Sequence, residues 1–105
     1  MIAISPPPPY YAVIFTSLRT EFDDGYADTA KRMEELAAEQ PGFLGIESAR
    51  NEIGITVSYW KSLEAIKNWK NNSEHLLAQQ AGKDVFYKNY KTRIALVEKD
   101  YGFEK

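Results

Sequence analysis

The pair Pro41-Gly42 restricts the fold of this sequence more than any other feature, because it separates a helical pattern from two strand patterns. Before the pair, apolar residues recur at the spacing of one helix face: Tyr26, Ala30, Met33 and Ala37. Asp23 or Asp24 is positioned to cap this helix at its start. Proline and glycine commonly follow a helix C-terminus, so the helix is expected to end just before Pro41.

Four runs rich in β-branched and aromatic residues predict strands at 10–19, 43–50, 54–60 and 90–101. Asn51-Glu52 predicts the turn of a hairpin between the second and third runs. A second helical region opens at Ser62, and 71–73 interrupts it with good capping residues, so helical pieces at 62–71 and 73–88 are expected. The order β-α-β-β-α-β predicts an α+β, ferredoxin-like fold with a four-stranded antiparallel sheet.

The consecutive prolines Pro6 to Pro9 predict an extended polyproline arm over residues 1–9, followed by one folded domain at 10–105. Two interpretations of the arm stay open at this stage. It is either a leader exposed to solvent, or an arm that lies across a neighbouring subunit.

Composition excludes several classes of function. Thirteen basic and fifteen acidic residues give a net charge of −2, which offers no electrostatic basis for binding nucleic acid. No apolar run approaches the roughly 20 residues that span a bilayer, and the N-terminus does not resemble a signal peptide. The absence of cysteine predicts a cytoplasmic protein, and one histidine makes a metal site unexpected.

Strand alternation predicts that apolar side chains occupy both faces of the sheet. In the third run, Ile55, Val57 and Tyr59 alternate with Thr56, Ser58 and Trp60. In the last run, Ile94 and Leu96 oppose Ala95 and Val97. Two helices cover one face of such a sheet, so the other face would expose a large apolar patch in a monomer. We therefore expect a homodimer that stacks two sheets face to face.

The second half of the later helical region carries two stripes. Leu77, Ala81 and Val85 have the spacing of a core-facing stripe. Nearly opposite lie His75, Gln79, Gly82 and Phe86. An imidazole, an amide, a bare backbone position and a ring could line a ligand cavity. The alternative is that His75 and Gln79 face water and Gly82 marks a bend.

Four further side chains are candidates for a role in this cavity. Trp60 has the position of a core anchor that buries about 200 Å², whereas Trp69, beside the helical break, is either a core residue or a cavity edge. Arg93, inside the last strand, must pair with a group such as Glu47 or meet a ligand. Tyr87 offers a phenol near the same place. No nucleophile–base pair, phosphate loop or dinucleotide fingerprint is recognisable.

The segments QPGFLGIES, ITVSYWKSLEAIKNWKNNSEH and VEKDYGF together resemble the antibiotic biosynthesis monooxygenase domain, over roughly residues 10 to 103. The resemblance implies a ferredoxin-like fold that pairs into a dimeric α/β barrel. It implies either oxygenation of aromatic polyketides with molecular oxygen and no prosthetic group, or haem degradation, or no assigned reaction.

This sequence matches the haem-degrading branch of the family at one of the three positions that carry that branch's function. Its helix tryptophan corresponds to Trp69, but its iron-ligating histidine falls on Gln79. Its first-strand asparagine falls near 15–17, where the chain has Ser17 and no asparagine. Haem degradation is therefore not expected, and Ser17 is kept as a candidate substrate-binding residue.

The cofactor-free reaction requires a substrate that donates an electron to oxygen, such as a small phenol or quinol in a dry cavity. We expect Trp69, His75 and Arg93 to carry the chemistry, with Trp60, Gln79, Phe86, Tyr87 and Ser17 contacting the substrate. Two alternatives stay open: a dimer that binds a small molecule without catalysis, and a peptide-docking module that uses the proline arm.

Overall fold

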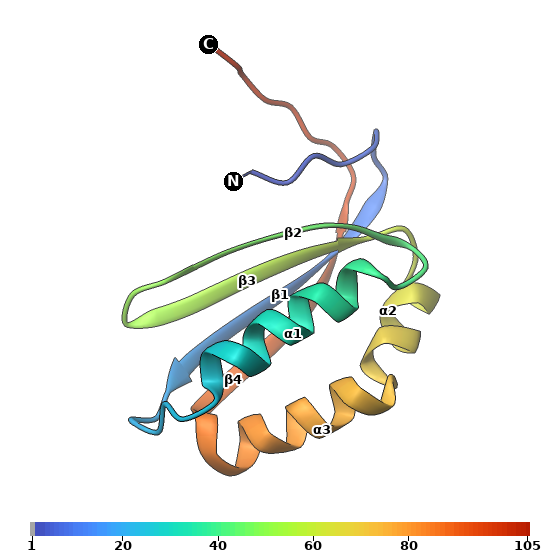
Figure 1. The fold of residues 1–105 in the computed structure, drawn as a ribbon. Helices are drawn as coiled ribbons and strands as arrows, with labels where there is room; N and C mark the ends of the chain where they lie inside the picture. The colour runs from blue at the N-terminus through green and yellow to red at the C-terminus, as the bar shows by residue number, and fades with distance from the viewer. Residues whose placement is uncertain (1) are drawn as a thin grey trace.

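Four antiparallel strands form a single sheet with all the helices on one of its faces (Figure 1), in a computed structural model that describes residues 2–105. The strand order is β2-β3-β1-β4. The strand bounds are Tyr10–Arg19 for β1, Phe43–Arg50 for β2, Ile53–Trp60 for β3 and Tyr87–Val97 for β4. The ferredoxin-like arrangement predicted from the element order is confirmed.

The helical layer consists of three helices and a short π-helical turn. Their bounds are Tyr26–Ala38 for α1, Leu63–Lys70 for α2, Ser73–Ala81 for α3 and Gly82–Phe86 for the turn η1. The side chain of Ser62 caps α2 by accepting from the Ala65 amide, and Asn72 caps α3 by accepting from the amides of Glu74 and His75. The predicted interruption at 71–73 is therefore a true boundary between two capped helices.

The pairing register assigns each strand residue to a face. Trp60 and Ser58 pair with Tyr11 and Val13 of β1, and this set lies beneath the helices. Ala37, Trp60, Ala65 and Ile66 form the buried core there. Ile55, Val57 and Tyr59 project from the opposite face, which no helix covers; we call it the open face. The alternation predicted for this strand agrees with the register.

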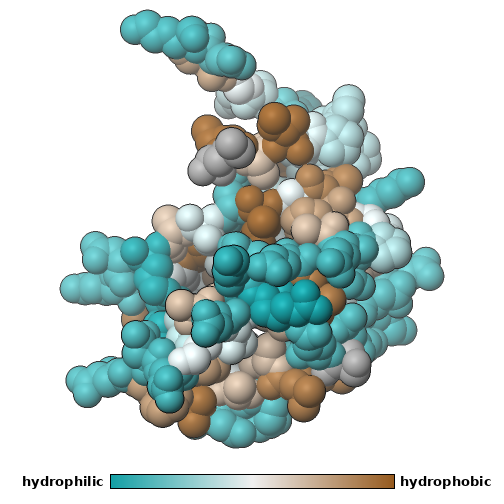
Figure 2. Space-filling view, viewed as in Figure 1, coloured by the Kyte–Doolittle hydropathy of each residue, from teal (hydrophilic) through white to brown (hydrophobic). Residues whose placement is uncertain are grey.

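The open face retains apolar surface, as the sequence predicted. Ile53 and Ile55 on β3 are 52% and 45% exposed. In the view of Figure 2, hydrophilic residues dominate, and hydrophobic ones appear both near the end where the chain termini emerge and along the opposite edge. Exposed apolar area of this kind is typical of a surface that another molecule covers.

Both chain ends are tied to one end of the open face. The Ala3 amide donates to Glu47, and the Ser5 hydroxyl donates to the phenol oxygen of Tyr10. The Tyr10 phenol in turn donates to Asp100 in the C-terminal tail. The arm is thus bonded to its own sheet at Ala3 and to Tyr10 at Ser5, while Ile2 and Ile4 are 84% and 89% exposed. Both interpretations of the arm stay open, and Figure 1 shows the two termini leaving the sheet together.

The start of α1 differs from the prediction. Gly25, with φ of +80°, occupies the N-cap position, and no side chain caps the helix there. Asp23 instead pairs with the Arg19 guanidinium at 3.2 Å. The left-handed backbone at Gly25 lets the chain turn sharply into α1, a conformation that aspartate adopts at greater cost.

The boundary between the last helix and the last strand also differs. The helical piece predicted for 73–88 ends at Ala81, and after η1 the strand begins at Tyr87 rather than residue 90 and stops at Val97. The Phe86 carbonyl accepts from the amide of Thr20 and from Arg19 Nε. These bonds fasten the chain to the end of β1, so pairing with β1 starts at Tyr87.

Candidate functional site

The inward face of α3 is the reverse of the predicted one. Leu77 and Val85, expected in the core, are 73% and 39% exposed. The other stripe faces the sheet: Gly82 and Phe86 are buried, and His75 and Gln79 are partly buried. Gly82 explains the orientation, since a Cβ there would lie 3.0 Å from the Tyr87 ring. The close approach of backbone to ring turns the polar stripe inward.

Trp60 is a core anchor and not a ligand-binding surface. Its side chain has 0% exposed area, its indole N–H donates to Ser58 Oγ at 2.9 Å, and Phe43 meets it edge-on. A ring with no accessible surface cannot contact a substrate, so the predicted substrate-binding role of Trp60 is wrong. Its burial fixes the position of the rings stacked above it.

Trp69 and His75 are brought together, as the sequence analysis expected. The Trp69 ring stacks on Trp60 with centroids 6.1 Å apart, and the His75 ring stacks on Trp69 at 4.0 Å and 11°. This column of three rings rises from the core through the end of α2 to the first turn of α3. The imidazole covers one face of the Trp69 ring, so a substrate cannot stack on that face.

The surroundings of His75 set its tautomer and its charge. Its Nδ1 lies 2.8 Å from the Trp69 carbonyl oxygen, and a carbonyl can only accept, so Nδ1 carries the proton of the neutral ring. Nε2 therefore keeps its lone pair. Burial lowers the pKa of His75 below its usual value, only partly opposed by the bond to Trp69. The neutral imidazole is a base with one free nitrogen.

Gln79 and Phe86 have structural partners. The Gln79 amide donates to the Lys70 carbonyl at 3.1 Å and satisfies the C-terminal end of α2. Phe86 is buried against Phe22 and Tyr26, with ring centroids 5.9 and 5.4 Å away. Gln79 thus links α2 to α3 near Trp69, whereas Phe86 anchors the opposite end of the helical layer.

Tyr87 and Ser17 lie on the helix-covered face, at the end of β1 distant from Trp69. The Tyr87 hydroxyl is 3.1 Å from that of Tyr26, and burial raises the pKa of Tyr87. Ser17 is 2% exposed and its hydroxyl accepts from Arg50. Ser17 stands six positions after Tyr11 on β1, and Tyr11 pairs with Trp60. Six positions of a strand span about 20 Å, so Ser17 lies about that far along β1 from the Trp60 end.

Arg93 does not join the other candidates. It pairs with Ile14, which pairs with Val57, and this row lies on the open face. Trp69 and His75 are on the other side of the sheet, so Arg93 cannot reach a ligand bound there within one protomer. Glu47 stands in the same row on β2, with β1 and β3 between the two residues, about 14 Å away. Glu47, the possible partner named from the sequence, therefore does not pair with Arg93 within one protomer.

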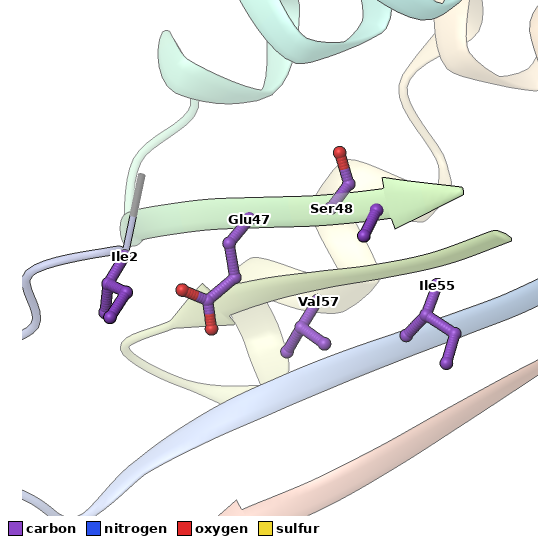
Figure 3. A pocket seen from close by; sticks show the side chains of 6 residues that line it. Ile2, Glu47, Ser48, Ile55 and Val57 are labelled. Carbon is purple, nitrogen blue, oxygen red and sulfur yellow. The ribbon is translucent and has the colours of Figure 1, made fainter. Parts of the chain in front are cut away.

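Glu47 has other partners. It accepts from the Tyr59 hydroxyl and from the Ala3 amide, and these bonds hold its pKa below the usual range. Burial and the bond to Glu47 raise the pKa of Tyr59 to about 12. Figure 3 shows Glu47, Val57 and Ile55 projecting from the same side of their strands and Ser48 from the other. With Ile2 they surround an open hollow of about 380 Å³.

A second hollow, of about 370 Å³, lies between α1 and α3, where Arg32 pairs with Glu74 and Leu77 is exposed. Neither hollow reaches the Trp69–His75 pair. Within residues 2–105 no group of three or more histidine, cysteine or carboxylate side chains is placed to hold a metal ion. In the same range no helix has the length and apolarity to cross a membrane.

Two residues to which the sequence analysis gave no functional role make contacts at the end of the sheet distant from Trp69. Arg50 reaches across β3 to Ser17, and Tyr26 pairs with Tyr87. The signal for Arg50 is Gly54, a glycine inside a strand, which often marks a close approach of other atoms. A Cβ on Gly54 would lie 2.1 Å from the Arg50 guanidinium.

Comparisons with known proteins agree with the fold and add a family. Residues 9–81 match the family described as antibiotic biosynthesis monooxygenase. The chain is 50% identical over 103 residues to the protein YqjZ of Bacillus subtilis, covering 96% of this chain and 90% of YqjZ, which is described as uncharacterised.

Solved structures of low sequence identity share the fold. SnoaB, a cofactor-independent oxygenase from Streptomyces nogalater, is 12% identical with a TM-score of 0.71, covering 93% of this chain and 100% of SnoaB. Rv0793 from Mycobacterium tuberculosis is 9% identical with a TM-score of 0.75, covering 89% and 99% of the two chains.

Proposed function

This chain belongs to the antibiotic biosynthesis monooxygenase family, and from that premise we propose that it oxygenates a small phenolic or quinol-like aromatic with molecular oxygen and no prosthetic group. Trp69 and His75 form the reactive pair. The description of SnoaB as a cofactor-independent oxygenase supports the reaction class by likeness of fold. Arg93 has no place in this site, for the geometric reason given above.

The observation that carries the proposal is the locked tautomer of His75. Its Nδ1–H is held by the Trp69 carbonyl, which leaves Nε2 as an acceptor, and its lowered pKa keeps it neutral near pH 7. Such a group removes the proton of a phenol. The stacked Trp69 ring holds the imidazole in one orientation, and a substrate ring would stack on the outer face of His75.

The proposed reaction converts a phenol and O₂ to a quinone and water. His75 Nε2 accepts the phenolic proton, and the phenolate transfers one electron to O₂, giving a substrate radical and superoxide. The two join at the ring carbon para to the oxygen. Loss of the C–H proton at that carbon breaks the O–O bond and leaves a second carbonyl and hydroxide, which takes the proton from His75. One oxygen atom ends in the quinone and the other in water.

We further propose that the working unit is a cytoplasmic homodimer formed through the open face, with the arm at 1–9 packed beside the domain at 10–105. The row that ends in Glu47 and Arg93 supports this pairing. If a twofold axis runs along the strands, Glu47 of one copy faces Arg93 of the partner subunit. The exposed Ile53 and Ile55 supply the apolar contact.

An oxygen electrode tests the proposed reaction. Protein dialysed against a chelator is given a panel of dihydroxynaphthalenes, and oxygen uptake is recorded for the unchanged chain, for Trp69→Ala and for Arg93→Gln. We expect uptake that depends on the phenol, falls at least about tenfold in Trp69→Ala, and is unchanged in Arg93→Gln. Equal uptake by the chain and by Trp69→Ala would contradict the assignment of the site.

A second candidate is a dimer that binds a small aromatic molecule without oxygenating it. It is favoured by one observation: the imidazole already covers a face of Trp69, and neither hollow adjoins the pair. Tryptophan fluorescence separates the two candidates. A panel member that quenches Trp69 emission with saturation, yet causes no oxygen uptake, would support the binding dimer over the oxygenase.

A further inference from the structure

Arg50 adopts an unusual path across the helix-covered face of the sheet. It stands at the end of β2, yet its guanidinium passes over β3 at Gly54 and donates to the hydroxyl and the carbonyl oxygen of Ser17 on β1. The crossing depends on glycine, because any Cβ at Gly54 would lie 2.1 Å from the guanidinium. The sequence thus holds a positive charge at a defined point above the sheet.

This guanidinium is only partly used by the protein. Among residues 2–105, the ion pairs join Arg19 to Asp23 and Arg32 to Glu74, and Arg50 has no carboxylate within 4.0 Å. A guanidinium carries five N–H donors, and Ser17 accounts for two of them. The Arg50 side chain is exposed, so a ligand from solvent can reach a guanidinium whose donors Ser17 uses only in part.

Tyr90 pairs with Ser17 in the register of β1 and β4, so it stands beside the point that Arg50 reaches. The Tyr26 and Tyr87 hydroxyls are 3.1 Å apart, so one of the two hydrogens is used between them and the other is free to donate. Phe15 lies against Tyr87 and Tyr90, with ring centroids 5.5 and 5.1 Å away. We call Arg50, Ser17, Tyr26, Tyr87 and Tyr90 the phenol–guanidinium cluster.

We propose that the phenol–guanidinium cluster binds the carboxylate of a small aromatic acid. The free N–H groups of Arg50 receive the carboxylate oxygens in the paired geometry that guanidinium favours. A tyrosine hydroxyl donates the further hydrogen bond, and the aromatic ring of the ligand packs against Phe15 and Tyr90. The cluster lies about 20 Å along β1 from the Trp69 end, so this site stands independently of the proposed oxygenase reaction.

Calorimetric titration with 2-naphthoate tests the proposal, with 2-naphthamide as the uncharged probe and inorganic phosphate as the probe for unspecific anion binding. The informative variant is Gly54→Ala, which retains every charge but displaces the Arg50 guanidinium. Arg50→Gln removes the charge itself. Lys67→Gln, which removes an exposed positive charge on α2 that forms no ion pair among residues 2–105, is the matched control.

We expect naphthoate to bind, naphthamide and phosphate to bind at least about tenfold more weakly, and both Gly54→Ala and Arg50→Gln to weaken naphthoate at least about tenfold. Lys67→Gln should leave the affinity unchanged. The proposal is overturned if Gly54→Ala binds naphthoate as tightly as the unchanged chain, or if phosphate binds as tightly as naphthoate. An equal loss in Lys67→Gln would likewise overturn it. Circular dichroism of each variant verifies its fold, and Gly54→Ala keeps the test decisive if Arg50→Gln does not fold.

Discussion

At the scale of single residues, the imidazole of His75 is the group whose surroundings do most to fix its chemistry. The ring stacks on Trp69, and its Nδ1–H donates to the Trp69 carbonyl oxygen. The backbone amide of His75 donates to the Asn72 side chain. Two contacts therefore hold the ring in one orientation, and the third holds the backbone that carries it. Preorganisation of this sort distinguishes a positioned base from a histidine on a solvated surface.

The lowered pKa of His75 predicts how stability depends on pH. The folded state binds this proton less readily than the unfolded chain, whose histidine pKa is about 6.5. Stability supplied by the neutral ring is therefore complete above about pH 6.5 and decreases as the pH falls through the folded-state pKa. Urea denaturation at a series of pH values between neutrality and about 5 should show this loss, and His75→Gln should reduce the slope. An identical slope in the variant would contradict it.

Residue-scale prediction from the sequence succeeded where ring size and spacing decide the outcome. Trp69 and His75 are one turn and a half apart around a capped break, and two large flat groups at that spacing meet in space. The prediction for Arg93 failed, because the face to which a strand residue points depends on the pairing register with the neighbouring strand, and the sequence alone does not give that register. Residue-scale prediction also overlooked Arg50, whose path depends on the missing side chain of a residue on another strand.

At the scale of elements, two glycines with positive φ, one directly before α1 and one directly before β2, allow a matched comparison. Gly25 at φ +80° has nothing within 4 Å of a Cβ, whereas at Gly42, φ +87°, a Cβ would lie 2.6 Å from Ala65. Gly25→Ala should cost about 1–2 kcal/mol of unfolding free energy from backbone strain alone. Gly42→Ala should cost about 1–3 kcal/mol more, from the added clash with α2.

Urea denaturation of the two glycine variants measures this difference. A larger loss in Gly25→Ala than in Gly42→Ala would contradict the close packing of the Pro41-Gly42 turn against α2. Equal losses would mean that strain alone, and no contact with Ala65, explains the glycine at that turn.

The break between α2 and α3 provides a second comparison. Asn72 accepts from the amides of Glu74 and His75, while the adjacent Asn71 makes no side-chain hydrogen bond in the described residues 2–105. Asn72→Ala should lower the unfolding free energy by about 1 kcal/mol, and Asn71→Ala should change it by less than about 0.5 kcal/mol. Because the cap also positions His75, Asn72→Ala should reduce oxygen uptake. Equal effects of the two changes on stability would refute the capping role.

Element-scale prediction was accurate for the first two strands and for the break between α2 and α3. The first two strands begin and end at the predicted residues, and proline, glycine and asparagine mark the observed boundaries. The orientation of α3 was predicted incorrectly, because apolar spacing favoured Leu77 and Val85 for the core. The tertiary structure turned the helix instead, through the close approach at Gly82 and the stack on Trp69.

At the scale of the whole molecule, the proposed dimer depends on the apolar side chains of the open face. Sedimentation equilibrium should give a mass twice the 12.0 kDa of one chain. Ile55→Glu places a charge at the centre of the apolar surface and should yield the single chain, since a buried unpaired charge is costly. Leu77→Glu, at a position on the helical side that is 73% exposed against 45% for Ile55, should remain a dimer. A monomeric unchanged chain would contradict the proposed pairing.

The overall architecture could be predicted because element order alone leaves few arrangements for a chain of this length. The positions of the arm and the tail could not, since they depend on single polar contacts to the sheet, such as the bond from Tyr10 to Asp100. The candidate site could be predicted only in part for a similar reason. The closeness of Trp69 and His75 follows from their spacing, but the empty volume beside the two rings depends on every neighbouring side chain.

The most direct test of the proposed oxygenase is the fate of isotope-labelled dioxygen in a turnover with the dihydroxynaphthalene that gives the fastest oxygen uptake. The account predicts one labelled atom in the quinone and one in water, and a rate at least about a hundredfold lower in His75→Gln, with Arg93→Gln unaffected. A quinone that carries no label, or an undiminished rate in His75→Gln, would contradict the central claim that His75 activates a phenol for direct reaction with oxygen.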